Sequence, residues 1–168
     1  MKWMILLVFG LTLTAANVQA AGVEKGGLTW FYDLNEAHNE SVKTNKPIFS
    51  FFTGSDWCGW CTMLQKNVFA KADFIAWAKA NVVLLELDFP KKTAQSAELK
   101  TQNQNMQQAL GVTGYPTIWL FTTSINAESG AFNLTTIGKL GYPSGAEKGK
   151  EEVKFLLEAN PLLAARKA

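Results

Sequence analysis

Apolar and polar positions along the chain follow helical and strand periods in turn. Residues 33–44 place apolar side chains on one helical face and stop at the breaker formed by residues 45–47. Residues 48–53 and 82–89 are apolar at nearly every position, which is typical of strands covered on both faces of a sheet. The alternation predicts an α/β domain.

The rest of the chain continues this alternation. We expect helices from Cys58 and over 73–80, 94–110 and 147–159, and strands over 117–122 and 134–140. The last two strands are expected to pair as an antiparallel hairpin, whereas strands joined through helices run parallel. We therefore predict a central mixed sheet flanked by helices on both faces.

Residues 1–20 have the features of a secretory signal peptide. Lys2 is followed by an apolar stretch and then by small residues before the expected cleavage after Ala20 or Ala21. Polar residues interrupt the apolar stretch, which makes it shorter than the roughly 20 apolar residues that span a bilayer. The mature protein, residues 22–168, is expected in the periplasm or secreted, where disulfides persist.

Composition narrows the classes of function. The 168 residues are 48% hydrophobic and 18% charged, which excludes a mainly disordered chain. The formal net charge is +2 and the lysines are scattered, so nucleic acid is not expected as a partner. Because the chain contains 2 cysteines, they cannot form a disulfide framework and act as one pair.

The candidate chemistry lies in Cys58-Gly59-Trp60-Cys61, where a predicted strand ends and a helix begins. Two cysteines separated by two residues can exist as a dithiol or as a disulfide with little backbone movement. The helix N-terminus lowers the pKa of the Cys58 thiol, which makes Cys58 the expected nucleophile. Cys61, one turn into the helix, is suited to resolve a mixed disulfide.

Three other roles for the cysteines fit the sequence less well. A zinc site needs four ligands, and the single histidine, His38, is assigned to a helix surface. Haem attachment needs a histidine where Thr62 stands. An inert disulfide would close too short a loop to constrain the unfolded chain much. We expect a redox-active pair that needs no metal or bound cofactor.

Residues 51–61, together with the Gly-Tyr-Pro-Thr segment 114–117, resemble the thioredoxin superfamily. Residues 45–47 and 68–69 resemble the secreted thioredoxin-like branch that includes the C-terminal domain of the interchange protein DsbD. The resemblance implies a thioredoxin fold over nearly all of the mature chain and thiol-disulfide exchange as the activity. It also implies that Pro116 is the cis-proline that faces the cysteines.

The sequence departs from the better-known thioredoxin pattern at two places. Phe52 stands where thioredoxins carry a buried aspartate, so Glu86 is the candidate for proton transfer to and from Cys61; its alternative is an ion pair with a lysine. Trp60 replaces a proline or a charged histidine. Gly59 and Trp60 add no positive charge beside the thiolate, which argues against a strong oxidant.

The substrate site is expected around the cysteines. A cis bond at Pro116 would let the Tyr115 backbone pair with an extended substrate segment, as an added strand does. Trp57 and Trp60 offer an apolar rim for such segments, although Trp57 would equally suit packing beneath the loop.

The expected function is that of a monomeric extracytoplasmic thiol-disulfide oxidoreductase, acting as a reductase or isomerase on exported proteins with disulfides or thiols. An unidentified redox partner, such as a membrane electron donor, would recharge it. The alternatives are a dithiol oxidase and a non-catalytic module of thioredoxin fold that binds a peptide or partner. Enzyme turnover separates the non-catalytic module from the reductase or isomerase and from the oxidase.

Overall fold

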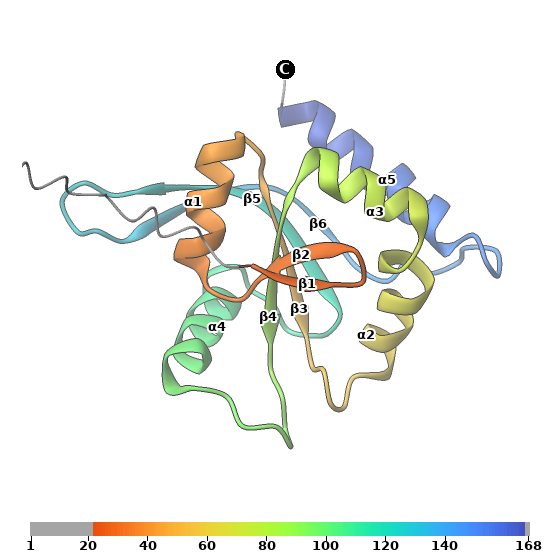
Figure 1. Ribbon diagram of the computed structural model, residues 1–168, viewed down its shortest axis with the longest axis horizontal. Helices are drawn as coiled ribbons and strands as arrows, with labels where there is room; N and C mark the ends of the chain where they lie inside the picture. The colour runs from red at the N-terminus through yellow and green to blue at the C-terminus, as the bar shows by residue number, and fades with distance from the viewer. Residues whose placement is uncertain (1–21, 167–168) are drawn as a thin grey trace, which may run out of the picture.

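A computed structural model describes residues 22–166, which contain one six-stranded sheet with helices on both sides (Figure 1). The strands are β1 (Val23–Lys25), β2 (Leu28–Phe31), β3 (Ile48–Thr53), β4 (Val83–Asp88), β5 (Thr117–Ile125) and β6 (Phe132–Leu140). The helices are α1 (Leu34–Thr44), α2 (Gly59–Leu64), the π-helical turn η1 (Gln65–Phe69), α3 (Ala72–Asn81), α4 (Ala97–Ala109) and α5 (Glu151–Arg166).

The sheet is mixed, as predicted, with the strand order β1-β2-β4-β3-β5-β6. β3 lies in the middle of the order, parallel to β4 and antiparallel to β5, and β5 and β6 form the expected hairpin. Helices α1 and α4 cover one face, and α2, α3 and α5 cover the other (Figure 1). The predicted fold class is confirmed.

Strand β3 contributes to both halves of the core because its side chains alternate between the faces. Phe49 and Phe51 pack on the face of α2, α3 and α5, in the same cluster as the two cysteines. Ile48 and Phe52 pack on the opposite face, against α1 and α4. The position of a residue along β3 therefore decides whether it faces the cysteines.

Local signals set the ends of α1. The Asp33 carboxylate accepts hydrogen bonds from the backbone N–H groups of Asn35 at 2.8 Å and Glu36 at 3.1 Å, which caps the helix N-terminus. At the other end Asn45 adopts the left-handed conformation with a φ of 53°. Pro47 follows and cannot continue the helix, so the predicted boundary was correct.

The N-terminal hairpin of β1 and β2 was not predicted. Its strands have 3 and 4 residues, too few for a period to stand out in the sequence. Trp30 of β2 pairs with Val23 of β1 and, on its other side, with Leu84 of β4, far along the chain. The pairing depends on tertiary contacts that a local pattern does not contain.

The helix that follows the cysteines continues into the π-helical turn η1, which was also not predicted. The Ala70 N–H donates to the Gln65 carbonyl at 2.8 Å, a bond that spans five residues. Both Val68 and Phe69 are buried there. The wider turn directs these consecutive side chains into the core.

Helix α5 begins later and ends later than the expected 147–159, and it continues through Pro161. Proline removes the hydrogen bond to the carbonyl four residues earlier, that of Leu157, whose side chain is on the exposed side of the helix. Ala159 before the proline and Leu163 after it are both buried in the core. Their packing favours continuing the helix past the proline.

His38 does not lie on a helix surface, which corrects the expectation from sequence. It is buried on α1, with its Nδ1 atom 2.8 Å from the Thr123 hydroxyl and its ring edge-on to Phe132. The hairpin of β5 and β6 extends over this side chain, and the α1 pattern alone did not show it.

Within residues 22–166 no helix is both long and apolar enough to cross a membrane. The predicted signal peptide, residues 1–20, lies outside the described residues.

Candidate active site

The two cysteines form a disulfide just beyond the C-terminal end of the central strand β3. The chain leaves β3 at Thr53 and turns back, and the Gly54 carbonyl accepts the backbone N–H groups of Trp57 at 3.2 Å and Cys58 at 2.8 Å. Cys58 is the cap residue before α2, and its Sγ atom accepts the Cys61 N–H at 3.2 Å. The predicted placement of the pair at a helix start is thus found.

The two sulfur-bearing residues differ in accessibility. Cys58 is 7% exposed and Cys61 is 1% exposed, and their Cα atoms lie 5.3 Å apart. An attacking thiol must be reached by a substrate, whereas a resolving thiol need only reach its neighbour. Of the two cysteines, Cys58 is therefore the one that a substrate reaches more easily.

Trp57 both packs against the active-site loop and contributes exposed apolar surface, the two roles that the sequence left open. Its indole N–H donates to the Phe89 carbonyl at 2.8 Å, and its ring meets Tyr115 edge-on at 5.6 Å between centroids. The ring is nevertheless 40% exposed. The ammonium of Lys91 lies 4.0 Å from the ring centroid. Trp57 packs on the loop with part of its surface and presents the rest to solvent.

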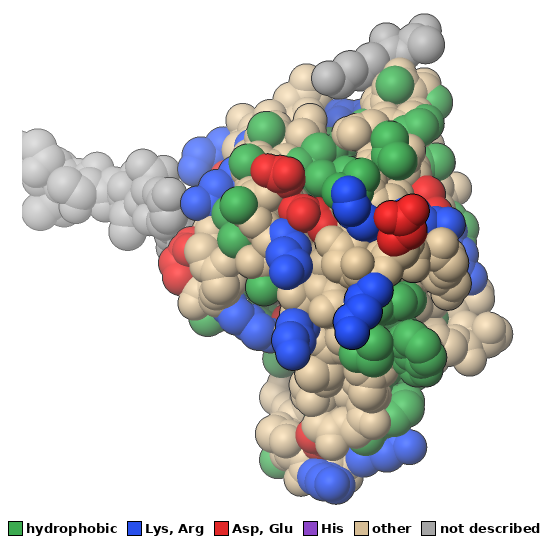
Figure 2. Space-filling view, turned by 90° about the vertical axis from the view of Figure 1, so that its right-hand side faces the viewer, with side chains coloured by type: hydrophobic (Ala, Val, Ile, Leu, Met, Phe, Trp, Pro, Cys, Tyr) green, Lys and Arg blue, Asp and Glu red, His purple; other side chains and the backbone are tan. Residues whose placement is uncertain are grey.

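Other apolar side chains extend this exposed surface. Trp60 is 58% exposed, Met63 is 42% exposed, and the Trp60 ring meets Tyr142 at 5.1 Å. We call Trp57, Trp60 and Met63 the apolar rim. On the side of the molecule that carries α2 and α5, hydrophobic side chains lie among lysine and arginine side chains (Figure 2).

The peptide bond between Tyr115 and Pro116 is cis, as the resemblance to thioredoxins implied. It immediately precedes β5, whose first residue Thr117 pairs with Phe52 of β3. The Tyr115 hydroxyl accepts a hydrogen bond from the Gln107 amide at 2.8 Å, and burial raises the pKa of this hydroxyl. This segment therefore lies at the same end of the strands as the disulfide.

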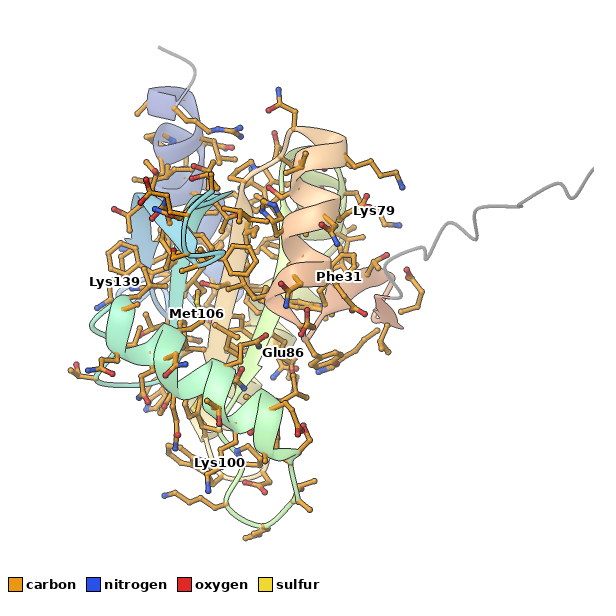
Figure 3. The ribbon with its side chains drawn as sticks, turned by 90° about the vertical axis from the view of Figure 1, so that its left-hand side faces the viewer. Phe31, Lys79, Glu86, Lys100, Met106 and Lys139 are labelled. Carbon is orange, nitrogen blue, oxygen red and sulfur yellow. A yellow bond between two sulfur atoms is a disulfide. The ribbon has the colours of Figure 1, made fainter. Side chains whose placement is uncertain are left out.

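Glu86 lies on β4, in the middle of the sheet, and is 5% exposed (Figure 3). Lys25 of β1 donates to its carboxylate at 3.1 Å, so the alternative of a lysine pair is found. Burial raises the pKa of the Glu86 carboxyl, and the charge of Lys25 opposes that shift. Both groups line a cavity of about 150 Å³ with Phe51 and Phe69, which pack in the same cluster as the cysteines.

No acid occupies the end of β3. Phe52 is fully buried on the face opposite the cysteines, with its ring stacked on Phe89 at 6.4 Å. The cysteine face at this level carries Phe51, which is also fully buried and pairs in register with Glu86. Phe52, which stands where thioredoxins carry a buried aspartate, therefore faces away from the disulfide.

Two aspartates that the sequence analysis did not assign to the site hold its loops together. The Asp56 carboxylate accepts the three successive backbone N–H groups of residues 91–93 at 2.7 to 2.9 Å, and these bonds lower its pKa to about 2. Asp88 accepts the backbone N–H of Ser55 at 2.8 Å and its hydroxyl at 2.5 Å. An aspartate in a turn was the available signal, but its partners lie more than 30 residues away.

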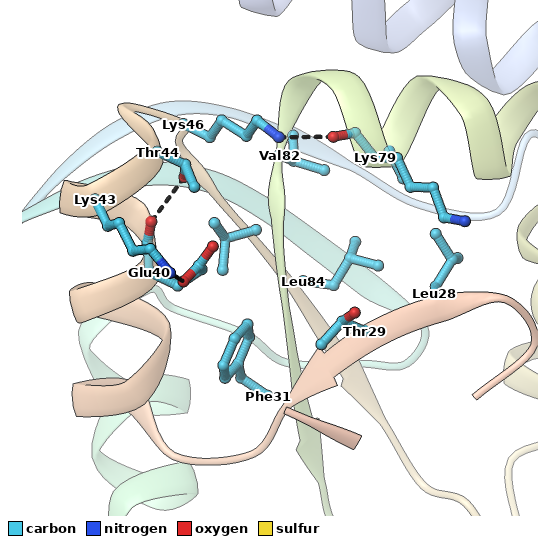
Figure 4. A pocket seen from close by; sticks show the side chains of 12 residues that line it. Leu28, Thr29, Phe31, Glu40, Lys43, Thr44, Lys46, Lys79, Val82 and Leu84 are labelled. Atoms are coloured by element: carbon cyan, nitrogen blue, oxygen red, sulfur yellow. Dashed lines mark hydrogen bonds and ion pairs between the residues drawn. The ribbon is translucent and has the colours of Figure 1, made fainter. Parts of the chain in front are cut away.

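A larger cavity, of about 320 Å³, lies away from the disulfide between α1, α3 and the edge of β2 (Figure 4). Two of its lysines, Lys43 and Lys46, have local partners. Lys46 donates to the Lys79 carbonyl at 2.6 Å, and Lys43 pairs with Glu40 at 3.5 Å. Lysines at helix C-termini favour the carbonyl ends of the helices, so their presence needs no ligand.

Among residues 22–166 no group of three or more His, Cys, Asp or Glu side chains is arranged to hold a metal ion. The chemistry that the described residues themselves offer is that of the Cys58–Cys61 disulfide.

The chain is similar in sequence to known proteins. Residues 34–131 match the family described as thioredoxin-like domain. The chain is 39% identical to the disulfide bond reductase DsbH of Chlamydia pneumoniae, over 90% of this chain and 91% of that protein. It is 24% identical to the thioredoxin-related protein DsbJ of the same organism, over 95% of this chain and 44% of that protein.

Two solved structures are similar in fold. A DsbH oxidoreductase superposes with a TM-score of 0.67 at 28% identity and covers 93% of this chain and 95% of its own. A thioredoxin from Thermus thermophilus, 18% identical, gives a TM-score of 0.54 over 81% of this chain and 87% of its own, which supports the fold alone. The family match, the DsbH relative and the disulfide at the helix start together show that the chain belongs to the thioredoxin-like family and is a thiol-disulfide oxidoreductase.

Proposed function

We propose that the protein acts outside the cytoplasm as a disulfide reductase or isomerase on exported proteins. The observation that carries the proposal is the Cys58–Cys61 disulfide at the start of α2, with Cys58 the more accessible of the two. The name of the DsbH relative, a disulfide bond reductase, supports the direction of exchange. The uncharged Gly59 and Trp60 support it as well, because neither stabilises the reduced form as a positive charge would.

In the reductive direction the Cys58 thiolate attacks one sulfur of a substrate disulfide. A Cys58–substrate bond forms and the other substrate sulfur leaves as a thiolate, which takes up a proton. Cys61 then loses its proton and attacks Cys58, which closes the disulfide and releases the second substrate thiolate. Two electrons pass from the protein to the substrate. The Cys61 N–H, 3.2 Å from the Cys58 sulfur, favours the thiolate form of Cys58.

Substrates are proposed to bind across the apolar rim and the segment before β5. Trp57 and Trp60 offer exposed aromatic surface on either side of Cys58. Tyr115 precedes the first paired residue of β5, so its backbone is placed to pair with an extended segment, and Pro116 orients that backbone. Such contacts suit flexible protein segments around a cysteine.

Glu86 is proposed to carry the proton that leaves Cys61. The raised pKa of its buried carboxyl favours proton uptake nearer neutral pH, and the carboxyl lies on the cysteine face of the sheet. Lys25 at 3.1 Å keeps the charged form accessible as well. The two influences together suit a group that gains and loses a proton during turnover.

The expected signal peptide, residues 1–20, is the basis for an extracytoplasmic location, where the mature chain 22–168 would act as a monomer. A separate redox partner, such as a membrane electron donor, would reduce the Cys58–Cys61 disulfide after each cycle. The disulfide itself supplies the redox chemistry, so the proposal requires no bound cofactor.

Trapping the mixed disulfide tests the proposal. Cys61→Ser removes the resolving thiol, so substrate proteins should remain linked to Cys58 and run as thiol-sensitive complexes on non-reducing gels. The double variant Cys58→Ser,Cys61→Ser is the control, since it lacks the nucleophile but keeps the apolar rim. If Cys61→Ser yields no such complexes while the control still retains the same partners, the protein binds but does not exchange disulfides.

The redox potential tests the direction. Equilibration with glutathione should give a value nearer to the roughly −270 mV of thioredoxin than to the roughly −120 mV of the oxidant DsbA. A value above about −150 mV would favour the dithiol oxidase instead.

A further inference from the structure

The Thr53 side chain is fully buried at the end of β3, yet its hydroxyl has no hydrogen-bond partner. Across residues 22–166 this is true of two buried side-chain polar atoms, the other being the Trp119 indole nitrogen on the opposite face of the sheet. Native proteins leave few buried polar groups unpaired, because each costs the free energy of its desolvation. The unpaired Thr53 hydroxyl therefore needs an explanation.

Thr53 lies on the face of the sheet that carries the redox pair. Alternation along β3 puts it on the same face as Phe51, which packs in one cluster with Cys58 and Cys61. The next residue, Gly54, accepts the Cys58 N–H at 2.8 Å through its carbonyl. Thr53 pairs with Asp88 of β4, and one further step of the β3–β5 register brings Pro116 opposite to it.

Among the residues of β3 that share this face, Phe49, Phe51 and Thr53, the Thr53 hydroxyl is the side-chain hydrogen-bond donor. Cys61 is 1% exposed, so water offers its sulfur little solvation. A buried thiolate without a donor is unfavourable, which would slow the step in which Cys61 attacks. In the disulfide the sulfur carries no charge and is a weak acceptor, which agrees with the unpaired hydroxyl of the oxidised state.

We propose that the Thr53 hydroxyl donates a hydrogen bond to the Cys61 sulfur once the disulfide opens, and so stabilises the thiolate that resolves the mixed disulfide. This inference rests on the roles of Cys58 and Cys61 proposed above. In that step the Cys61 thiolate forms a bond to the Cys58 sulfur, and the bond from Cys58 to the substrate sulfur breaks. The proton of the Cys61 thiol passes to Glu86 or water, and Thr53 keeps its own proton throughout.

A chromogenic aromatic disulfide, 5,5′-dithiobis(2-nitrobenzoate), separates the two steps. Attack by Cys58 on the reagent releases the first coloured thiolate, and attack by Cys61 on the resulting mixed disulfide releases the second. Thr53→Val keeps the side-chain shape and removes the hydroxyl. We expect the first phase to be unchanged and the second to slow about tenfold at neutral pH, since hydrogen bonds to charged groups contribute this much or more.

The pH profile distinguishes a stabilised thiolate from a packing effect. In Thr53→Val the second phase should reach half of its maximal rate about one pH unit higher than in the unaltered protein. Thr53→Ser restores a hydroxyl and should restore most of the rate. The variant Thr53→Val should also be at least as stable to urea, because it removes an unpaired buried polar group.

Ser50→Ala is the matched control. Ser50 is a buried hydroxyl on the same strand, but it lies on the other face and donates to the Trp119 carbonyl at 3.1 Å. This variant should be less stable and should leave the second phase unchanged. If the unaltered protein shows both phases and Thr53→Val resolves at the same rate across pH 5 to 9, the Thr53 proposal is wrong. If the unaltered protein shows no second phase, the proposed exchange mechanism itself fails.

Discussion

Replacing Gly54 by alanine should displace Trp57 from the active-site loop. A Cβ atom at position 54 would lie 2.4 Å from both Cε2 and Nε1 of the Trp57 ring. Ordinary contact begins near 3.4 Å, so the ring would have to move by about 1 Å. Gly54 does not adopt a left-handed conformation, so alanine is acceptable to the backbone and the ring is the group that must give way.

The expected cost follows from the contacts that the ring would lose. The hydrogen bond from the indole to the Phe89 carbonyl, 2.8 Å long, contributes about 0.5–1.5 kcal/mol. The edge-on contact with Tyr115 contributes about 0.5–1.5 kcal/mol more. Alanine in place of glycine recovers about 0.4–1 kcal/mol by restricting the unfolded chain. Gly54→Ala should therefore lower the free energy of unfolding by about 1 kcal/mol, near the middle of the roughly 0–2.6 kcal/mol that these ranges leave.

A double-mutant cycle measures this coupling directly. Urea unfolding followed by far-UV circular dichroism would compare Gly54→Ala in the unaltered protein and in a Trp57→Ala background. Without the ring there is nothing to displace, so the substitution should be neutral or slightly stabilising there. Gly59→Ala is the matched control, because no atom lies within 4 Å of a Cβ at that position. An equal loss of stability in both backgrounds would refute the reasoning.

Two further predictions concern the carboxylates of the site. Glu86→Gln should slow the resolving step by about 100-fold while leaving attack by Cys58 intact, as rapid mixing with a disulfide reagent would show; an unchanged rate between pH 6 and 8 would return Glu86 to a structural role. Because the folded-state pKa of Glu86 is raised, its contribution to stability is greatest below the unfolded pKa and falls as pH rises through the folded value. This part of the pH dependence of urea unfolding should be absent in Glu86→Gln. Asp56 has the opposite sign: its pKa is lowered to about 2, so its contribution is present at neutral pH and is lost as pH falls from about 4 towards 2. Asp56→Ala should remove that acid dependence and speed hydrogen exchange of the three backbone N–H groups at residues 91–93, and unchanged exchange there would contradict the prediction.

The sequence pattern predicted the central strands and helices well because neighbouring residues suffice to specify them. The apolar runs of β3 and β4, the cap at Asp33 and the position of Cys58 between a strand and a helix are written in neighbouring residues. The disulfide follows from the same local order, since two intervening residues on a helix bring the sulfurs together. The predicted chemistry of the pair therefore needed no tertiary structure.

Other features of the site arise from residues that meet only in the folded chain. Lys25 and Glu86 are separated by 61 residues, and the sequence offered no reason to pair that lysine with that acid. The backbone partners of Asp56 come from the loop after β4, and a backbone N–H carries no sequence signal.

The sequence by itself determined the period of each main element, the placement of the cysteines and, through the resemblance of its motifs, the family and its chemistry. Only the tertiary structure decided which side chains share the cysteine face. It placed Phe52 on the face opposite the disulfide and Thr53 on the face of the disulfide, and it covered His38 with the β5–β6 hairpin. The physical reason is that local pattern sets how side chains alternate, whereas strand pairing and helix packing set which layer each alternating face meets.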